Sequence, residues 1–187
     1  QYPLVEVLTA ALFAVAGAVF FHLDDSMSWM KTAFVLWTLG CALAVAVYDA
    51  RHMEVPMILV WLGIGAAITY FLVYDALMFE WAQSILDVRL YSGTAAGVGL
   101  FLFFFSLSYI SKERWMGFGD AYLALWMGMV LGLPTAIVGF VLSFWIGSVW
   151  SVGWLAMSRK TMKSAVPFAP FLLAAMMIMM FLDGAYP

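Results

Sequence analysis

The sequence predicts an all-α protein, a polytopic transmembrane helical bundle of about seven spans plus one interfacial amphipathic helix. Two observations lead to this prediction. Of the 187 residues, 66% are apolar and only 10% are charged, whereas a soluble domain is about 45–50% apolar and about 25% charged. The apolar residues also recur in stretches close to the ~20 residues that a helix needs to cross a bilayer. We therefore expect residues 1–187 to form a single integral-membrane domain.

Seven apolar stretches follow one another along the chain. They are residues 5–23, 29–48, 56–74, 93–110, 120–133, 135–157 and 168–182. The fifth is short, and it ends at Gly132-Leu133-Pro134, a sequence typical of a turn. We therefore expect the fifth and sixth stretches to form a tight helical hairpin.

Residues 75–91 have a different pattern. The polar residues Glu80, Gln83, Ser84 and Asp87 recur at helical spacing, and apolar residues occupy the opposite face. This pattern favours an amphipathic helix lying in the membrane interface over an irregular loop.

The basic residues indicate how the spans are oriented. Alternate loops, at residues 49–55, 111–119 and 158–167, contain six of the eight: Arg51, Lys112, Arg114, Arg159, Lys160 and Lys163. The opposite loops contain only Lys31 and Arg89. Because basic residues accumulate on the cytoplasmic side, we expect these three loops and the N-terminus inside, and the C-terminus outside.

The composition also disfavours several classes of function. The net charge is −3 and the basic residues are scattered, which is not typical of a nucleic-acid-binding protein. Cys41 is the only cysteine, which excludes an intramolecular disulfide and a multi-cysteine zinc site. The first apolar stretch is itself long enough to span the bilayer, so we expect no separate targeting peptide.

Small residues recur at four-residue spacing in several spans. They are Gly93 and Gly97, Gly128 and Gly132, and Ser143, Gly147 and Ser151. Small side chains let helix backbones approach closely in lipid. We therefore expect these residues at helix–helix contacts and assign them no chemistry.

Two carboxylates stand at the cytoplasmic ends of predicted spans. Asp49 follows the second span, where the helix dipole disfavours a negative charge, and Asp120 begins the fifth, directly after Gly117-Phe118-Gly119. Each has a structural alternative. Asp120 is a preferred residue type for a helix N-cap, and Asp49 could pair with Arg51 or His52.

Taken together, the two acids indicate chemistry. Both are predicted at the same depth on the same face, and two carboxylates held close together can share one proton. Such a pair can activate water as a general base and protonate a leaving amine as a general acid. The glycines before Asp120 can take positive φ and let a substrate chain approach the backbone closely.

Three segments resemble a known family. Gly117-Phe118-Gly119-Asp120 matches the GxGD signature of membrane aspartyl proteases, and within that group the chain resembles the type IV prepilin peptidases and archaeal preflagellin peptidases. Asp49 followed seven residues later by Pro56 is similar to the family's first-aspartate segment. Pro167-Phe168-Ala169-Pro170 is similar to its Pro-Phe-Gly-Pro segment. The resemblance covers roughly residues 29–182.

The resemblance implies a peptidase domain and its substrate. Members of the family remove a short basic leader from pilins, pseudopilins or flagellin-like precursors, typically after a glycine, at the cytoplasmic face of the inner membrane. Asp49 and Asp120 would be the catalytic pair, with no metal or other cofactor. The partners would be a prepilin-like membrane protein and the lipid bilayer, with no nucleic acid, and the oligomeric state stays open.

Other residues of the three motifs would support the site: Gly117, Phe118, Gly119, Pro56, Pro167, Phe168 and Pro170. Glu54 and Glu113 lie in the same two loops and are candidates to attract the basic leader. Pairing with neighbouring basic residues on the surface is the preferred interpretation for both glutamates.

The sequence departs from the family pattern at three positions. Tyr122 stands where the family often has Lys, Met57 where a polar residue is common, and Ala169 where Gly lies between the two prolines. Larger relatives have a cytoplasmic cysteine motif that binds zinc and accompanies N-methylation. With Cys41 alone, this chain resembles a short form that lacks the methyltransferase region.

Two other classes of function stay open on the sequence. A proton- or cation-coupled transporter subunit could use Asp49 and Asp120 as an ion site, because carboxylates in membrane spans are usually functional. Against it, both acids lie near one face and no charged residue occupies the middle of a span. A non-enzymatic pilus-assembly protein could keep the same fold, although the presence of both aspartates argues against it.

Overall fold

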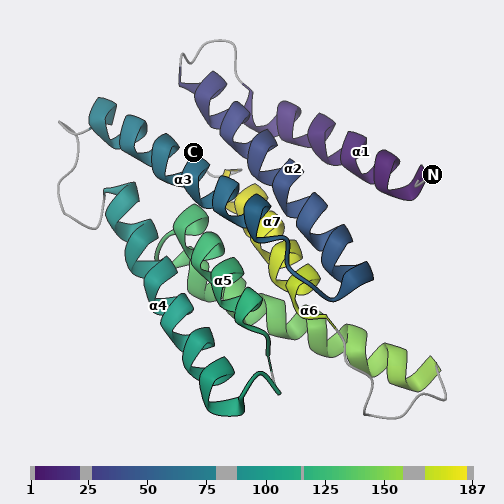
Figure 1. Cartoon of the computed structure of the whole chain (residues 1–187). Helices are drawn as coiled ribbons and strands as arrows, with labels where there is room; N and C mark the ends of the chain where they lie inside the picture. The colour runs from purple at the N-terminus through teal and green to yellow at the C-terminus, as the bar shows by residue number, and fades with distance from the viewer. Residues whose placement is uncertain (1–2, 22–26, 79–87, 115, 158–166, 185–187) are drawn as a thin grey trace.

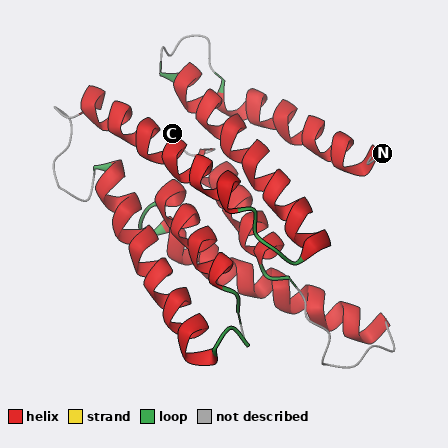
Figure 2. Cartoon of the chain, in the orientation of Figure 1, coloured by secondary structure: helices red, strands yellow, loops and turns green. Residues whose placement is uncertain are grey.

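The computed structural model describes residues 3–21, 27–78, 88–114, 116–157 and 167–184, and these residues form a bundle of α-helices without strands (Figures 1 and 2). The helices are α1 (Pro3–Phe20), α2 (Ser28–His52), α3 (Met57–Met78), α4 (Arg89–Ser111), α5 (Phe118–Leu131), α6 (Thr135–Met157) and α7 (Ala169–Gly184). The predicted fold class, an all-helical membrane bundle, is confirmed.

Four of the described helices, α2, α3, α4 and α6, are long and apolar enough to cross a bilayer, and the apolar helices α1, α5 and α7 are shorter. Seven spans therefore stay a prediction, although seven helices occupy the predicted stretches. Within the predicted amphipathic helix, the first residues belong to α3 and the last ones begin α4, whereas residues 79–87 lie outside the described residues.

The helices run alternately up and down, so that one end of the bundle collects the C-terminal ends of α2, α4 and α6 and the N-terminal ends of α5 and α7. This end faces the lower right in Figure 1. It contains the α2–α3 loop and the described residues between α4 and α5, which belong to two of the three segments predicted to be cytoplasmic, and the sidedness itself stays a prediction.

Helix α5 is the centre of the bundle, where it packs against α3, α4, α6 and α7. Nine of its 14 residues are buried, and the Trp126 side chain is fully enclosed. Because other helices surround α5, its residues pack against protein on nearly every side. Helix α1 lies at the edge of the bundle, against α2 and α7.

The predicted hairpin between the fifth and sixth stretches is confirmed. Gly132 ends α5 with a φ of +67°, a conformation that favours glycine. On α4, the Ser92 hydroxyl accepts a hydrogen bond from the Leu133 backbone N–H at 2.8 Å and donates one to the Leu133 carbonyl at 3.3 Å. This serine therefore ties the far end of α5 to α4.

At the same end of the bundle, α3 supplies a cap to α4. The Asp75 carboxylate accepts hydrogen bonds from the backbone N–H groups of Arg89, at 3.0 Å, and Leu90, at 2.8 Å. The first N–H groups of a helix have no partner within the helix, and this carboxylate satisfies two of them. It explains why α4 begins at Arg89, four residues before the predicted start.

The small residues of α4 and α5 lie at the contact between these helices, as predicted. A methyl group built on Gly93 would lie 2.6 Å from the carbonyl oxygen of Met129, and one on Gly97 would lie 2.7 Å from that of Leu125. Gly128 faces the Gly97 backbone in the same way. These contacts are between backbones, which cannot rotate away as a side chain would.

Gly97→Ala should therefore destabilise the bundle, because the added methyl group forces α4 and α5 apart. Overpacking of this kind costs about 1–3 kcal/mol. Gly99, two residues later in α4, is the matched control because a methyl group there meets nothing within 4 Å. Gly99→Ala should leave stability unchanged or raise it by about 0.5–1 kcal/mol, since Ala is the better helix former. Unfolding in detergent measures both, and equal effects of the two variants would contradict the close packing.

Candidate active site

Asp49 lies in the last turn of α2 and is buried, with 5% of its surface exposed. The helix continues to His52 and ends where Met53 takes a left-handed backbone (φ 53°), with the Met53 N–H donating to the Asp49 carbonyl at 2.8 Å. The carboxylate oxygen Oδ2 is buried and has no hydrogen-bond partner among the described residues. Buried polar atoms are normally paired, so this oxygen requires an explanation.

Pairing with His52, one of the two structural alternatives for Asp49, does not account for this oxygen. The His52 ring is turned back along the helix, with Nδ1 3.2 Å from the Tyr48 carbonyl oxygen and the ring stacked on Tyr48 at 4.3 Å. No pairing with His52 therefore satisfies Oδ2 of Asp49.

Asp120 lies in the first turn of α5, but it is not the N-cap. The N-cap is Gly117, in an extended backbone conformation (φ −74°, ψ 154°), so the N-cap alternative for Asp120 is wrong. The Asp120 N–H donates to the Gly117 carbonyl at 3.2 Å. A carboxyl at the third helical position commonly lies close to the N-cap backbone.

The glycines before Asp120 act differently from the prediction. Neither Gly117 nor Gly119 has a positive φ. The conformational freedom of glycine therefore does not explain why glycine occupies these two positions. Gly119 instead makes a close contact, since a methyl group on it would lie 2.8 Å from Cγ2 and 2.9 Å from Cβ of Val55. Val55 belongs to the loop between α2 and α3, so this contact joins the two segments that contain the aspartates.

The fold brings the two carboxyls into electrostatic range of each other. The charge of Asp49 therefore acts on the Asp120 carboxyl. The helices that hold them, α2 and α5, are both packed against α3 and α7. Within the described part of the chain, no three His, Cys, Asp or Glu side chains gather as a metal site would require. The arrangement is two acids that approach each other from separate helices at one end of the bundle.

Comparison with known proteins decides the family. The model of the type IV leader peptidase family matches residues 36–152, which is more than half of the chain and includes both aspartates. The chain belongs to the type IV leader peptidase family.

The chain is also similar to bifunctional relatives, each named prepilin leader peptidase/N-methyltransferase. Its identity is 30% to that of Bacillus subtilis (98% of this chain, 66% of the relative), 28% to that of Xanthomonas campestris pv. campestris (97% and 58%) and 26% to that of Legionella pneumophila (97% and 58%). The chain thus spans less than two thirds of the length of these relatives. No solved structure matches it.

The proline segments that resemble this family begin helices at the same end of the bundle. Pro56 directly precedes α3, and its carbonyl accepts the Leu59 N–H at 3.0 Å. Pro167 and Phe168 precede α7, where the Phe168 carbonyl accepts the Phe171 N–H at 3.0 Å, and Pro170 lies in the first turn.

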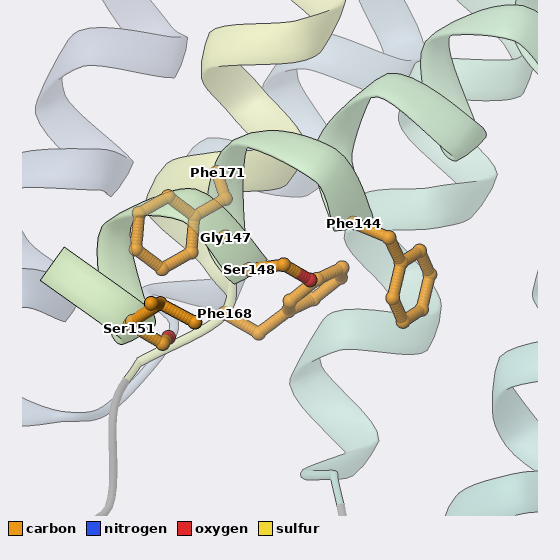
Figure 3. A pocket seen from close by; sticks show the side chains of 7 residues that line it. Phe144, Gly147, Ser148, Ser151, Phe168 and Phe171 are labelled. Atoms are coloured by element: carbon orange, nitrogen blue, oxygen red, sulfur yellow. The ribbon is translucent and has the colours of Figure 1, made fainter. Parts of the chain in front are cut away.

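The Phe168 side chain lies in an aromatic cluster, 5.0 Å from the Phe144 ring and 6.0 Å from the Phe104 ring. Figure 3 shows the pocket beside it, of about 370 Å³. It is lined by Phe144, Gly147, Ser148, Ser151, Val152, Phe168 and Phe171. The third motif therefore contributes an apolar wall between α6 and α7 rather than a polar group.

The remaining residues singled out in the sequence are Glu54, Glu113 and Tyr122. Glu54 and Glu113 are both exposed. Tyr122, one of the three predicted departures from the family pattern, packs its ring 5.7 Å from Trp61 and 5.3 Å from Phe101. Tyr122 therefore makes aromatic contacts about half a helical turn after Asp120.

Sequence reasoning missed two residues that shape the site, Val55 and Ser108. Val55 contacts Gly119, and the buried Ser108 hydroxyl donates to the Met116 carbonyl at 2.9 Å. A signal was present for Ser108, a polar residue within an apolar stretch. No local signal marks Val55, whose role depends on a segment far away in the sequence.

Proposed function

We propose that this protein is a membrane-embedded aspartyl endopeptidase that removes the short basic leader from type IV prepilin-like precursors. The observation that carries the proposal is the pair Asp49 and Asp120, held at one end of the bundle in a chain of the type IV leader peptidase family. The names of the relatives, each a prepilin leader peptidase, support the substrate class.

In the proposed mechanism, one water molecule lies between the two carboxyls. The ionised carboxyl accepts a proton from the water as its oxygen attacks the scissile carbonyl carbon. The protonated carboxyl donates its proton to the carbonyl oxygen, and the tetrahedral intermediate then collapses, with a proton passing to the leaving amine. The unpaired Oδ2 of Asp49 supports this role, because it leaves one buried acceptor available to a water molecule.

We place the reaction at the cytoplasmic face of the inner membrane. The basic loops that join α2 to α3 and α4 to α5 lie at the end of the bundle that holds both aspartates, and the distribution of basic residues orients that end inward. A precursor whose basic leader remains in the cytoplasm, and whose apolar helix lies in the bilayer, would present its junction at this depth. Glu54 and Glu113 are exposed in the two loops and are candidates to attract the leader, with pairing to neighbouring basic residues as the preferred alternative.

The test is cleavage of a prepilin-like peptide by the purified protein in liposomes. The peptide has a basic leader, a glycine at the junction and an apolar helix, and mass spectrometry identifies the products. Cleavage after the glycine supports the proposal. Intact peptide, with folded protein and several different leaders, would sink it.

The dyad also predicts a bell-shaped dependence of kcat/KM on pH. The reaction needs one ionised and one protonated carboxyl, so the rate should fall in acid, where both are protonated, and in base, where both are ionised. Cleavage assays from about pH 4 to about pH 9 measure both limbs. A rate that stays constant across this range would argue against a shared proton.

A further inference from the structure

The chain between α4 and α5 turns sharply just before Asp120. Lys112 and Glu113 both have a left-handed backbone, with φ of 52° and 59°. Residues other than glycine rarely adopt this conformation, which costs about 1 kcal/mol or more for each residue. Two such residues in succession persist only where surrounding contacts hold them.

Ser108 supplies contacts on both sides of this turn. Its backbone carbonyl accepts hydrogen bonds from the Glu113 N–H at 3.0 Å and from the Ser111 hydroxyl at 3.2 Å. Its own hydroxyl donates to the carbonyl of Met116 at 2.9 Å. One residue in the last full turn of α4 therefore binds both the start of the turn and the residue that leads into α5.

The Ser108 hydroxyl is also shielded from water, because the residue is fully buried. A hydrogen bond in such a site is not readily replaced by solvent, and removing one partner leaves the other unsatisfied. The bond to Met116 should therefore be persistent.

Met116 connects this anchor to the carboxyl. It directly precedes Gly117, the N-cap of α5, and the Gly117 carbonyl accepts the Asp120 N–H at 3.2 Å. A shift of Met116 is thus passed through Gly117 to the backbone that holds the Asp120 carboxyl. Ser108 itself contributes no group to the pair of acids.

We propose that Ser108 is a positioning residue, which fixes the start of α5 and so holds the Asp120 carboxyl in place toward Asp49. The effect on turnover rests on the proposed peptidase function, whereas the effect on the Asp120 carboxyl does not. A misplacement of about 1 Å costs up to about a hundredfold in rate, so a positioning role has a measurable consequence.

The test compares Ser108→Ala with Ser143→Ala. Ser143 is the matched control, since it is also fully buried in an apolar helix and donates its hydroxyl to a backbone carbonyl, that of Phe140, at 2.6 Å. Ser108→Ala should lower kcat about 10- to 100-fold with little change in KM. Ser143→Ala should leave both constants near those of the wild type. Ser108→Cys, with a weaker donor of similar size, should fall between and serves if the Ala variant does not fold.

A second readout is independent of turnover. The ¹³C resonance of the Asp120 carboxyl, assigned by its loss in Asp120→Asn, should shift or broaden in Ser108→Ala and not in Ser143→Ala. An unchanged resonance, or a kcat equal to that of Ser143→Ala, would overturn the positioning role. Cleavage that survives Asp120→Asn would overturn the proposed function instead, so the two failures are distinguishable.

Discussion

Asp49→Asn and Asp120→Asn should each reduce leader cleavage by about a thousandfold or more while the bundle stays folded. The amide has nearly the same shape as the carboxyl but cannot exchange a proton with water or substrate, so it removes general acid–base chemistry. Asn also keeps a side-chain oxygen that can accept a hydrogen bond. Rates come from single-turnover cleavage assays, and circular dichroism and thermal unfolding report on the fold.

Asp75→Asn is the control for this pair. It also exchanges a carboxylate for an amide, but at the opposite end of α3, where Asn still accepts a hydrogen bond at the start of α4. Its cleavage rate should match that of the wild type. The double variant of Asp49 and Asp120 should be no slower than the slower single variant, because residues that act as a unit are not additive. Strong cleavage by either single variant would rule out the dyad.

Gly119→Ala should also have a large effect, a loss of about 10- to 100-fold in kcat. The new methyl group would meet Cβ and Cγ2 of Val55 at 2.9 and 2.8 Å. Cβ is fixed to the backbone, so the loop or the first turn of α5 must move, and the loop after Asp49 moves relative to Asp120. Steady-state assays of cleavage give kcat and KM.

Gly117→Ala is the matched control, since a methyl group there has no contact closer than 3.9 Å and the backbone is not left-handed. It should lower kcat far less than Gly119→Ala. Val55→Gly removes both clashing atoms, so it should restore activity to Gly119→Ala in the double variant, with a clear coupling energy. If Val55→Gly restores nothing, the contact between the two segments is not the reason for the loss.

The features predictable from the sequence were those with a local signature. Composition and apolar stretches gave the helical membrane class, Gly132 and Pro134 gave the hairpin, and the four-residue spacing of Gly93 and Gly97 gave the close packing of α4. The start of α4 was missed because its cap, Asp75, comes from another helix. The end of α2 was placed too early because Asp49 and the polar residues after it resemble a loop, whereas Met53 closes the helix beyond them.

The candidate site was predictable to a similar degree. Asp49 and Asp120 were predicted from charge, depth and motif, and the structure brings the two carboxyls within electrostatic range of each other. The reason for Gly119 was not predictable, because it depends on the distance to Val55 and on no property of the glycine segment itself. Ser108 has a local signal, a polar residue within an apolar stretch, but its partner Met116 lies beyond a turn whose shape the sequence does not reveal.

The two serines of α4 have a consequence for where the chain can change length. Ser92 binds Leu133, shortly after α5, and Ser108, sixteen positions later and about 24 Å along the helix axis, binds Met116, shortly before it. One inserted or deleted residue between the serines would rotate one of them by about 100° relative to the other. Only one of the two serines could then keep its hydrogen bonds to the ends of α5. Insertions and deletions are therefore excluded from this part of α4, and they can be accommodated in the connections between helices.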